Sequence, residues 1–435
     1  MITGKPFLLL SAQVDSRSGY GQSSRDFAQH LIALDKYDVK IVPIGWGACP
    51  NGVLKKDNPK DKLILDRIQN TPLTRQPDIF VQVAIPNEFQ PIGKYNIGYT
   101  AGIETTLASP AWIEGCNRMN LVLVTSEHSK TIFESTTYNK NDPNGHQIGT
   151  LKLEKPVEVL HNCADTNIYK KTIDVLPIIS EIFDPIVEKF GFLFVGHWLQ
   201  GEFGQDRKNV GMLIKVFLET FKNTKKNKPF LMLKTSGANF SLMDREDILS
   251  KIEKIKSTVA SDTELPSVYL VHGELTDEEM NGLYNHPKIK AHVSFTRGEG
   301  FGMPLLEASL SMKPVIASGW SGQLDFLNKE ESVLVGGKLE KVHPSAVWEG
   351  VIEKDSSWFT VDYPMAANAL MYTFMEQDKL IPLAKKLGRK NRELFSYSAL
   401  QKRLGELMTK YVPPMAVAVP FILPKLRKIG VDDAK

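Results

Sequence analysis

Two glutamates lie eight positions apart in a glycine-rich stretch, Glu299 and Glu307 in "RGEGFGMPLLEASLSMKPVIASGWSG" (297–322). The apolar run 288–296 predicts a strand, and Pro304 suits the first turn of a helix, where its missing N–H would be unpaired anyway. Glu299 is then expected in the loop and Glu307 one turn inside the helix. A helix N-terminus favours an anion, and glycines let backbone approach a ligand, here Gly298, Gly300 and Gly302. A nucleotide sugar carries the hydroxyls and phosphates that such a site would bind.

A second glycine-bearing segment, "GYGQSS" (19–24), follows the first predicted strand. Its strand–loop–helix context predicts a phosphate contact at Gly19, Tyr20 and Gly21, although a tight turn without a ligand is also compatible with it. A dinucleotide fingerprint would need a third glycine where the chain has Ser24, which weakens an NAD-binding interpretation.

The 435 residues exceed what one hydrophobic core usually organises, so two domains are expected. Lys and Arg (53) nearly balance Asp and Glu (50), and this balance does not imply a polyanionic partner. The three cysteines fit neither a disulfide framework nor a zinc site, and we expect a reducing, cytoplasmic location. The longest apolar stretch, 415–423, is too short for a transmembrane segment.

Apolar runs alternate with amphipathic segments along most of the chain, which predicts an α/β fold with two doubly wound, Rossmann-like parallel sheets facing each other across a cleft. We expect about five strands in the second sheet. The expected divisions are an N-terminal domain over 1–175, a linker over 176–190, a second domain over 191–375, and C-terminal helices with a tail over 376–435 that pack back on the first domain.

The stretch "EGFGMPLLEASLSMKPVIAS" (299–318) resembles the two-glutamate signature of retaining glycosyltransferases of the GT-B fold, family 4. Further segments resemble this family in sequence order and cover most of the chain: 16–31, 121–133, 157–169, 192–217, 268–286 and 391–411. In 157–169, Cys163 and Ala164 depart from the family's usual Gly-Val. The resemblance implies an acceptor-side first domain and a nucleotide-sugar-binding second domain.

The resemblance also implies roles for individual residues. Glu307 would accept hydrogen bonds from the donor ribose, and Glu299 would lie beside the donor sugar. Lys208, with Arg207 beside it, would meet the charge of the leaving diphosphate. The donor-binding set implied is Gly19, Tyr20, Gly21, Arg207, Lys208, Gly300, Phe301, Gly302 and Glu307, and the catalytic set is Glu299, Lys208 and Glu104.

Glu104, in "GYTAGIETTLASPAW" (98–112), resembles an acidic residue that faces the acceptor in some family members. It would orient the acceptor hydroxyl or take its proton, although a solvated loop glutamate is an equal alternative. His197 and His292 are interpreted as structural. The tail 421–430 leaves a peripheral membrane contact open.

These inferences predict a retaining transferase that uses a UDP- or GDP-sugar and no cofactor. The chain has no D-x-D triplet, so metal-independent catalysis is expected. The acceptor stays open among a glycan, a small molecule, a protein and a modified nucleobase. Two rival functions are an NAD(P)-dependent oxidoreductase and a noncatalytic protein of the same fold that binds sugar or nucleic acid.

Overall fold

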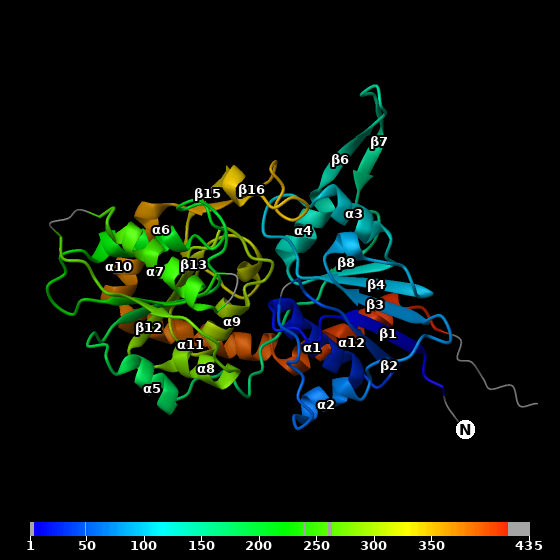
Figure 1. Cartoon of the computed structure of the whole chain (residues 1–435), viewed down its shortest axis with the longest axis horizontal. Helices are drawn as coiled ribbons and strands as arrows, with labels where there is room; N and C mark the ends of the chain where they lie inside the picture. Colours follow the sequence, from blue (N-terminus) through cyan, green and yellow to red (C-terminus); the bar gives the residue numbers. More distant parts are fainter. Residues whose placement is uncertain (1–3, 48, 238–239, 260–262, 416–435) are drawn as a thin grey trace, which may run out of the picture.

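The computed structural model describes residues 4–47, 49–237, 240–259 and 263–415. Two lobes lie side by side, each built on a parallel sheet with helices on both faces (Figure 1). The prediction of an α/β fold with two doubly wound sheets is therefore confirmed. The tail beyond residue 415, including the segment considered for membrane contact, lies outside the described residues.

The first sheet has the strand order β2-β1-β3-β4-β5-β8 and all its pairs are parallel. Its strands are β1 (Phe7–Ala12), β2 (Asp38–Pro43), β3 (Ile79–Val83), β4 (Tyr95–Thr100), β5 (Leu121–Val124) and β8 (Val157–Val159). Both faces of this sheet are buried, which explains why its strands read as nearly continuous apolar runs.

Four helices belong to this lobe, namely α1 (Gly19–Ala33), α2 (Pro59–Leu65), α3 (Pro110–Asn117) and α4 (Glu127–Ser135). Helix α1 begins two residues before Gly21, because the Ser18 side chain caps it by accepting from the Gly21 N–H at 2.9 Å. The segment that the sequence placed in a loop is thus the first turn of this helix. A short 3₁₀ helix, η1 (Pro86–Glu88), follows β3.

The second sheet has the order β11-β10-β9-β12-β13-β14, again with parallel pairs. The strands are β9 (Gly191–Val195), β10 (Phe230–Lys234), β11 (Val268–Val271), β12 (Ile289–Ser294), β13 (Val315–Ser318) and β14 (Val333–Val335). Our expectation of about five strands missed β14, which is only three residues long.

Helices cover both faces of the second sheet, in the order α6 (Val210–Phe221), α7 (Leu242–Lys256), α8 (Asp277–Asn285), α9 (Met303–Leu310) and α10 (Tyr363–Met375). A short helix, α5 (Pro177–Phe183), stands inside the segment predicted as a plain linker. Phe192 and Phe194 point to one buried face and Leu193 to the other, as the two-residue period of a strand requires.

The two C-terminal helices connect the lobes. Helix α11 (Gln377–Leu394) packs on α9 of the second lobe, whereas α12 (Tyr397–Tyr411) packs on α1 of the first (Figure 1). On α12, Leu404, Leu407 and Met408 complete the first-lobe core.

Two antiparallel hairpins were not predicted. One, β6 (Thr137–Asn141) with β7 (Gln147–Lys152), projects from the first lobe (Figure 1). The other, β15 (Gly337–Lys341) with β16 (Ser357–Val361), belongs to the second lobe and touches the first near Thr106. Short 3₁₀ turns stand at η2 (Gly322–Asp325) and η3 (Pro344–Ala346).

Candidate functional site

An ion-pair cluster lies where loops from the carboxyl ends of both sheets meet. Lys208 Nζ is 2.5 Å from Glu299 Oε1, and Arg207 Nη1 is 3.4 Å from Glu299 Oε2. The same Arg207 nitrogen donates to the Gly298 carbonyl at 2.9 Å. The structure therefore brings together the glutamate and the two cations that the sequence had singled out about 90 residues apart.

The two cations are held by the start of α6. Asn209, the residue after Lys208, adopts a left-handed conformation (φ 56°) directly before the first residue of that helix. Asn209 is fully buried, and its N–H donates to the Asp206 carbonyl at 3.0 Å. This turn fixes the backbone on either side of Lys208.

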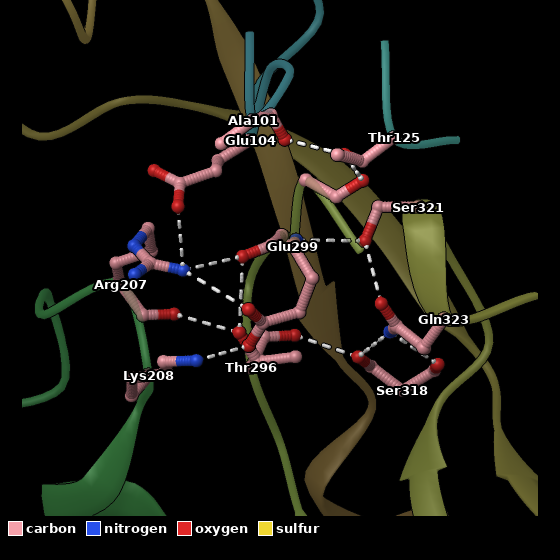
Figure 2. Close-up of polar contacts among 12 residues, drawn as sticks. Ala101, Glu104, Thr125, Arg207, Lys208, Thr296, Glu299, Ser318, Ser321 and Gln323 are labelled. Carbon is pink, nitrogen blue, oxygen red and sulfur yellow. Dashed lines mark hydrogen bonds and ion pairs between the residues drawn. The ribbon is translucent and has the colours of Figure 1, made fainter. Parts of the chain in front are cut away.

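A chain of hydrogen bonds supports the Glu299 loop (Figure 2). The Ser321 hydroxyl accepts from the Glu299 N–H at 3.0 Å and lies 2.9 Å from Gln323 Oε1. Gln323 Nε2 donates to Ser318 Oγ at 3.0 Å, and the Ser318 hydroxyl donates to the Thr296 carbonyl at 2.7 Å. Every one of these side chains is buried, so Glu299 stands on a rigid support.

Sequence reasoning missed this supporting network. Ser321 has a positive φ of 74°, which is uncommon outside glycine. The polar stretch 318–323 directly after the β13 run was the available signal, because side chains at the carboxyl end of a parallel strand face the same edge as Glu299.

Glu104 reaches this cluster from the first lobe. Its Oε1 lies 3.0 Å from Arg207 Nη1, so Arg207 stands between two carboxylates, one from each lobe (Figure 2). The Glu104 side chain is 29% exposed and that of Glu299 9%. The loop glutamate is therefore neither fully solvated nor fully enclosed.

Two glycines allow the lobes to touch here. A Cβ on Gly298 would be 1.9 Å from the Glu104 carbonyl oxygen, and one on Gly300 would be 2.2 Å from the Ala101 carbonyl oxygen. The close backbone approach that we expected toward a ligand is made, in this structure, to the first lobe. Gly302 has a different reason to be glycine, since it stands at the N-cap position of α9 with a left-handed φ of 100°.

Burial and ion pairing shift the pKa values of the charged groups in this cluster in opposite directions. Burial raises the pKa of Glu299, but Lys208 and Arg207 outweigh it and hold that pKa below its ordinary value. Burial also raises the pKa of Glu104, and Arg207 does not fully compensate. Burial lowers the pKa of Lys208, opposed by Glu299. Of the two carboxylates, Glu299 is the better stabilised as an anion.

Glu307 has other partners than Glu299 does. It lies half-buried on α9 and accepts from the Tyr284 hydroxyl at 3.0 Å. Burial, with the negative charge of Asp277, raises the pKa of Glu307 to about 8. The expected helix position, one turn after Pro304, is found. Glu299 therefore lies among cations, and Glu307 lies beside a tyrosine and near further acids.

The remaining predicted donor residues have mainly structural contacts in this structure. Gly19 is exposed with open space around it, whereas a Cβ on Gly21 would be 1.9 Å from the Ser16 carbonyl oxygen. The Tyr20 hydroxyl accepts from the Ala101 N–H at 3.1 Å, and its ring stacks on Trp46. The Phe301 ring is buried against Phe326 and Phe395, so only its backbone is available to a donor.

The two histidines are placed in hydrogen-bonded positions. His197 Nδ1 lies 3.1 Å from Ser236 Oγ, and burial together with Lys208 and Arg207 lowers the His197 pKa. His292 Nε2 lies 3.1 Å from Ser311 Oγ, inside the second lobe. His197 therefore adjoins the cation cluster, whereas His292 is a buried structural residue.

The described part of the chain contains neither a metal-binding cluster nor a membrane-spanning helix. Within residues 4–47, 49–237, 240–259 and 263–415, no group of three or more His, Cys, Asp or Glu side chains is arranged to hold a metal ion. In the same residues, no helix combines the length and apolar character needed to span a bilayer.

Comparison with known proteins finds likeness in structure but not in sequence. No family model matches the chain, and no curated protein does. Among solved structures, a sucrose-phosphate synthase from Thermosynechococcus elongatus superposes with a TM-score of 0.60 at 14% identity, covering 93% of this chain and 98% of that one.

Two further structures agree. Anabaena HepE in complex with UDP and glucose gives a TM-score of 0.57 at 14% identity, over 93% of this chain and all of that one. A glycosyltransferase from Rickettsia africae gives 0.58 at 13% identity, over 94% and 99%. Since these likenesses extend over nearly the whole of both chains, the protein has the GT-B fold.

Proposed function

We propose that this chain is a glycosyltransferase that moves a sugar from a nucleoside-diphosphate donor to an acceptor hydroxyl. The observation that carries the proposal is the cluster of Arg207, Lys208 and Glu299 at the junction of the two lobes of a GT-B fold. Ligands of doubly wound folds bind at the carboxyl ends of the strands, which is where this cluster lies. The UDP and glucose in the HepE structure favour a UDP-sugar as the first donor to test.

Each charged residue has a role in this proposal. The ammonium of Lys208 and the guanidinium of Arg207 stabilise the negative charge that grows on the departing diphosphate. Glu299, held by its backbone bond to Ser321, lies beside the donor sugar. Glu307 accepts hydrogen bonds from the ribose hydroxyls, for which its ionised form is the stronger acceptor. Gly19 and the backbone of 300–302 line the donor site.

We infer a retaining, front-face reaction of the family 4 type. The bond between the anomeric carbon and the diphosphate oxygen breaks, and the acceptor oxygen bonds to that carbon from the same face. The acceptor proton passes to the leaving diphosphate oxygen. The charge on the diphosphate is met by side-chain cations, so we further propose that the reaction needs no metal ion. We propose that Glu104, a first-lobe carboxylate beside Arg207, orients the acceptor hydroxyl.

We also propose that the enzyme works in a reducing compartment, the cytoplasm. All three cysteines are unpaired thiols, and Cys116 and Cys163 are buried. Burial raises the pKa of both thiols, so neither is an activated nucleophile.

The test is donor hydrolysis by the purified chain, measured with a panel of UDP-, GDP- and ADP-sugars in buffer containing EDTA. We expect slow, saturable release of nucleoside diphosphate from one donor. Lys208→Met should lower that rate about 100-fold, because it removes a cation that meets the leaving group.

Lys222→Met is the matched control, since Lys222 is the residue directly after α6 and pairs with Glu219 on the surface. It should hydrolyse the donor at the wild-type rate. Absence of release from every donor, or equal rates in the two lysine variants, would contradict the proposed function.

A further inference from the structure

The Arg207 guanidinium is shared among three acceptors. Its Nη1 atom lies 3.0 Å from Glu104 Oε1, 3.4 Å from Glu299 Oε2 and 2.9 Å from the Gly298 carbonyl oxygen. The first of these acceptors belongs to the first lobe and the other two to the second. A carboxylate from across the junction thus holds one of the two cations that the proposed function assigns to the donor diphosphate.

The charges of this cluster cancel. Two cations, Arg207 and Lys208, face two carboxylates, Glu104 and Glu299. A diphosphate that entered this neutral group would meet both carboxylates at close range, and like charges at a few ångströms repel. Removing one carboxylate from the group leaves a net positive site for the diphosphate.

The two carboxylates differ in how firmly they are held. Glu299 is bound by both cations, its N–H is fixed on Ser321, and its side chain is 9% exposed. Glu104 pairs with Arg207, and its side chain is 29% exposed. The pKa directions agree, because the cations hold the pKa of Glu299 low whereas burial leaves that of Glu104 raised.

The backbone around Glu104 is anchored while its carboxylate is not. The Glu104 carbonyl oxygen abuts Gly298 without room for a Cβ. Two residues later, the Thr106 N–H donates to the Ser357 carbonyl at 2.9 Å, and the Ser357 N–H donates to Thr106 Oγ1 at 2.8 Å. The carboxylate can therefore leave Arg207 by side-chain rotation while its loop keeps its place.

We propose that Glu104 is an internal competitor of the donor, a first-lobe carboxylate that occupies Arg207 until the donor diphosphate displaces it. The inference rests on the proposed function. Once displaced, the carboxylate remains at the junction. It is then free to accept a hydrogen bond from the hydroxyl of the sugar acceptor. Donor binding then precedes productive acceptor binding, and Glu104 is the residue that links the two events.

The test is calorimetric titration of UDP into the wild-type chain and Glu104→Gln. The amide keeps the shape of the side chain but not its charge, so UDP should bind about three- to tenfold more tightly to the variant. Glu104→Asp keeps the charge on a shorter side chain. Its UDP affinity should lie between those of the wild type and Glu104→Gln. It also carries the test if Glu104→Gln does not fold.

Glu219→Gln is the matched control. Glu219 lies on α6 and pairs with Lys222 on the surface, outside the cation cluster, so the UDP affinity of this variant should equal that of the wild type. If Glu104→Gln binds UDP equally or more weakly than the wild type, the competitor role is wrong. If the wild type binds none of UDP, GDP and ADP, the proposed function itself has failed, which is a separate result.

Discussion

At the residue scale, the site separates two glutamates that look equivalent in the sequence. Glu299 is surrounded by Lys208 and Arg207, which favour its anion, whereas Glu307 lies beside Tyr284 and the negative charge of Asp277. Their environments push the two pKa values apart. This is the arrangement by which carboxyl groups acquire different roles at one pH.

The raised pKa of Glu307 predicts a pH-dependent stability. Its folded-state pKa is about 8, above its value of about 4.5 in the unfolded chain, so the folded state binds the proton more tightly. The contribution to stability is therefore full below about pH 4.5 and is lost as the pH rises through 8. Glu307→Gln is neutral at every pH and should escape this loss.

Thermal unfolding of both chains at pH 5 and pH 9 measures the effect. The unfolding temperature of the variant minus that of the wild type should be larger at pH 9 than at pH 5, by about 2 °C or more. An identical difference at the two pH values would show that Glu307 does not titrate in this range.

At the element scale, the loops that follow β4 and β12 are shaped to touch each other. Gly298 and Gly300 leave no space for a Cβ against the backbone of Glu104 and Ala101. Glu299 lies between these two glycines in the chain, so the geometry of the site depends on how closely the two loops approach.

Gly298→Ala should hold the lobes apart at this point, because its Cβ would be placed 1.9 Å from the Glu104 carbonyl oxygen. Displacing catalytic groups by about 1 Å is costly, and we expect transfer or donor hydrolysis to fall at least about tenfold. Small-angle X-ray scattering should show a larger radius of gyration.

The control for this variant is Gly149→Ala on β7, where an added Cβ meets open space. It should change neither the activity nor the radius of gyration. Wild-type activity in Gly298→Ala would mean that the loop contact is not needed for catalysis.

Much of the element order was predictable because strands buried on both faces read as uninterrupted apolar runs, as in "FLFV" (192–195) and "LVLV" (121–124). Pro304 likewise marked the start of α9. Strand β14 was missed because three residues carry no period, and the hairpins because β6 and β15 are largely exposed and polar. The partnership of Glu104 with Arg207 depends on packing between lobes, which no local pattern contains.

At the scale of the whole molecule, several contacts across the junction hold the lobes together. Asp325 Oδ2 accepts from the Glu127 N–H at the start of α4, at 2.9 Å, and lies 3.0 Å from His161 Nε2. Arg17 pairs with Glu274 at another part of the junction. A second-lobe carboxylate thus caps a first-lobe helix, and α12 adds an apolar contact on α1. The two lobes are therefore joined at several points of the junction.

Binding of a nucleoside diphosphate by the cations at the lobe junction is best measured by calorimetric titration of UDP, GDP and ADP in EDTA-containing buffer. We expect saturable binding of at least one diphosphate by the wild type, weakened about tenfold or more in Lys208→Met. Absence of binding by the wild type, or undiminished binding by Lys208→Met, would contradict it.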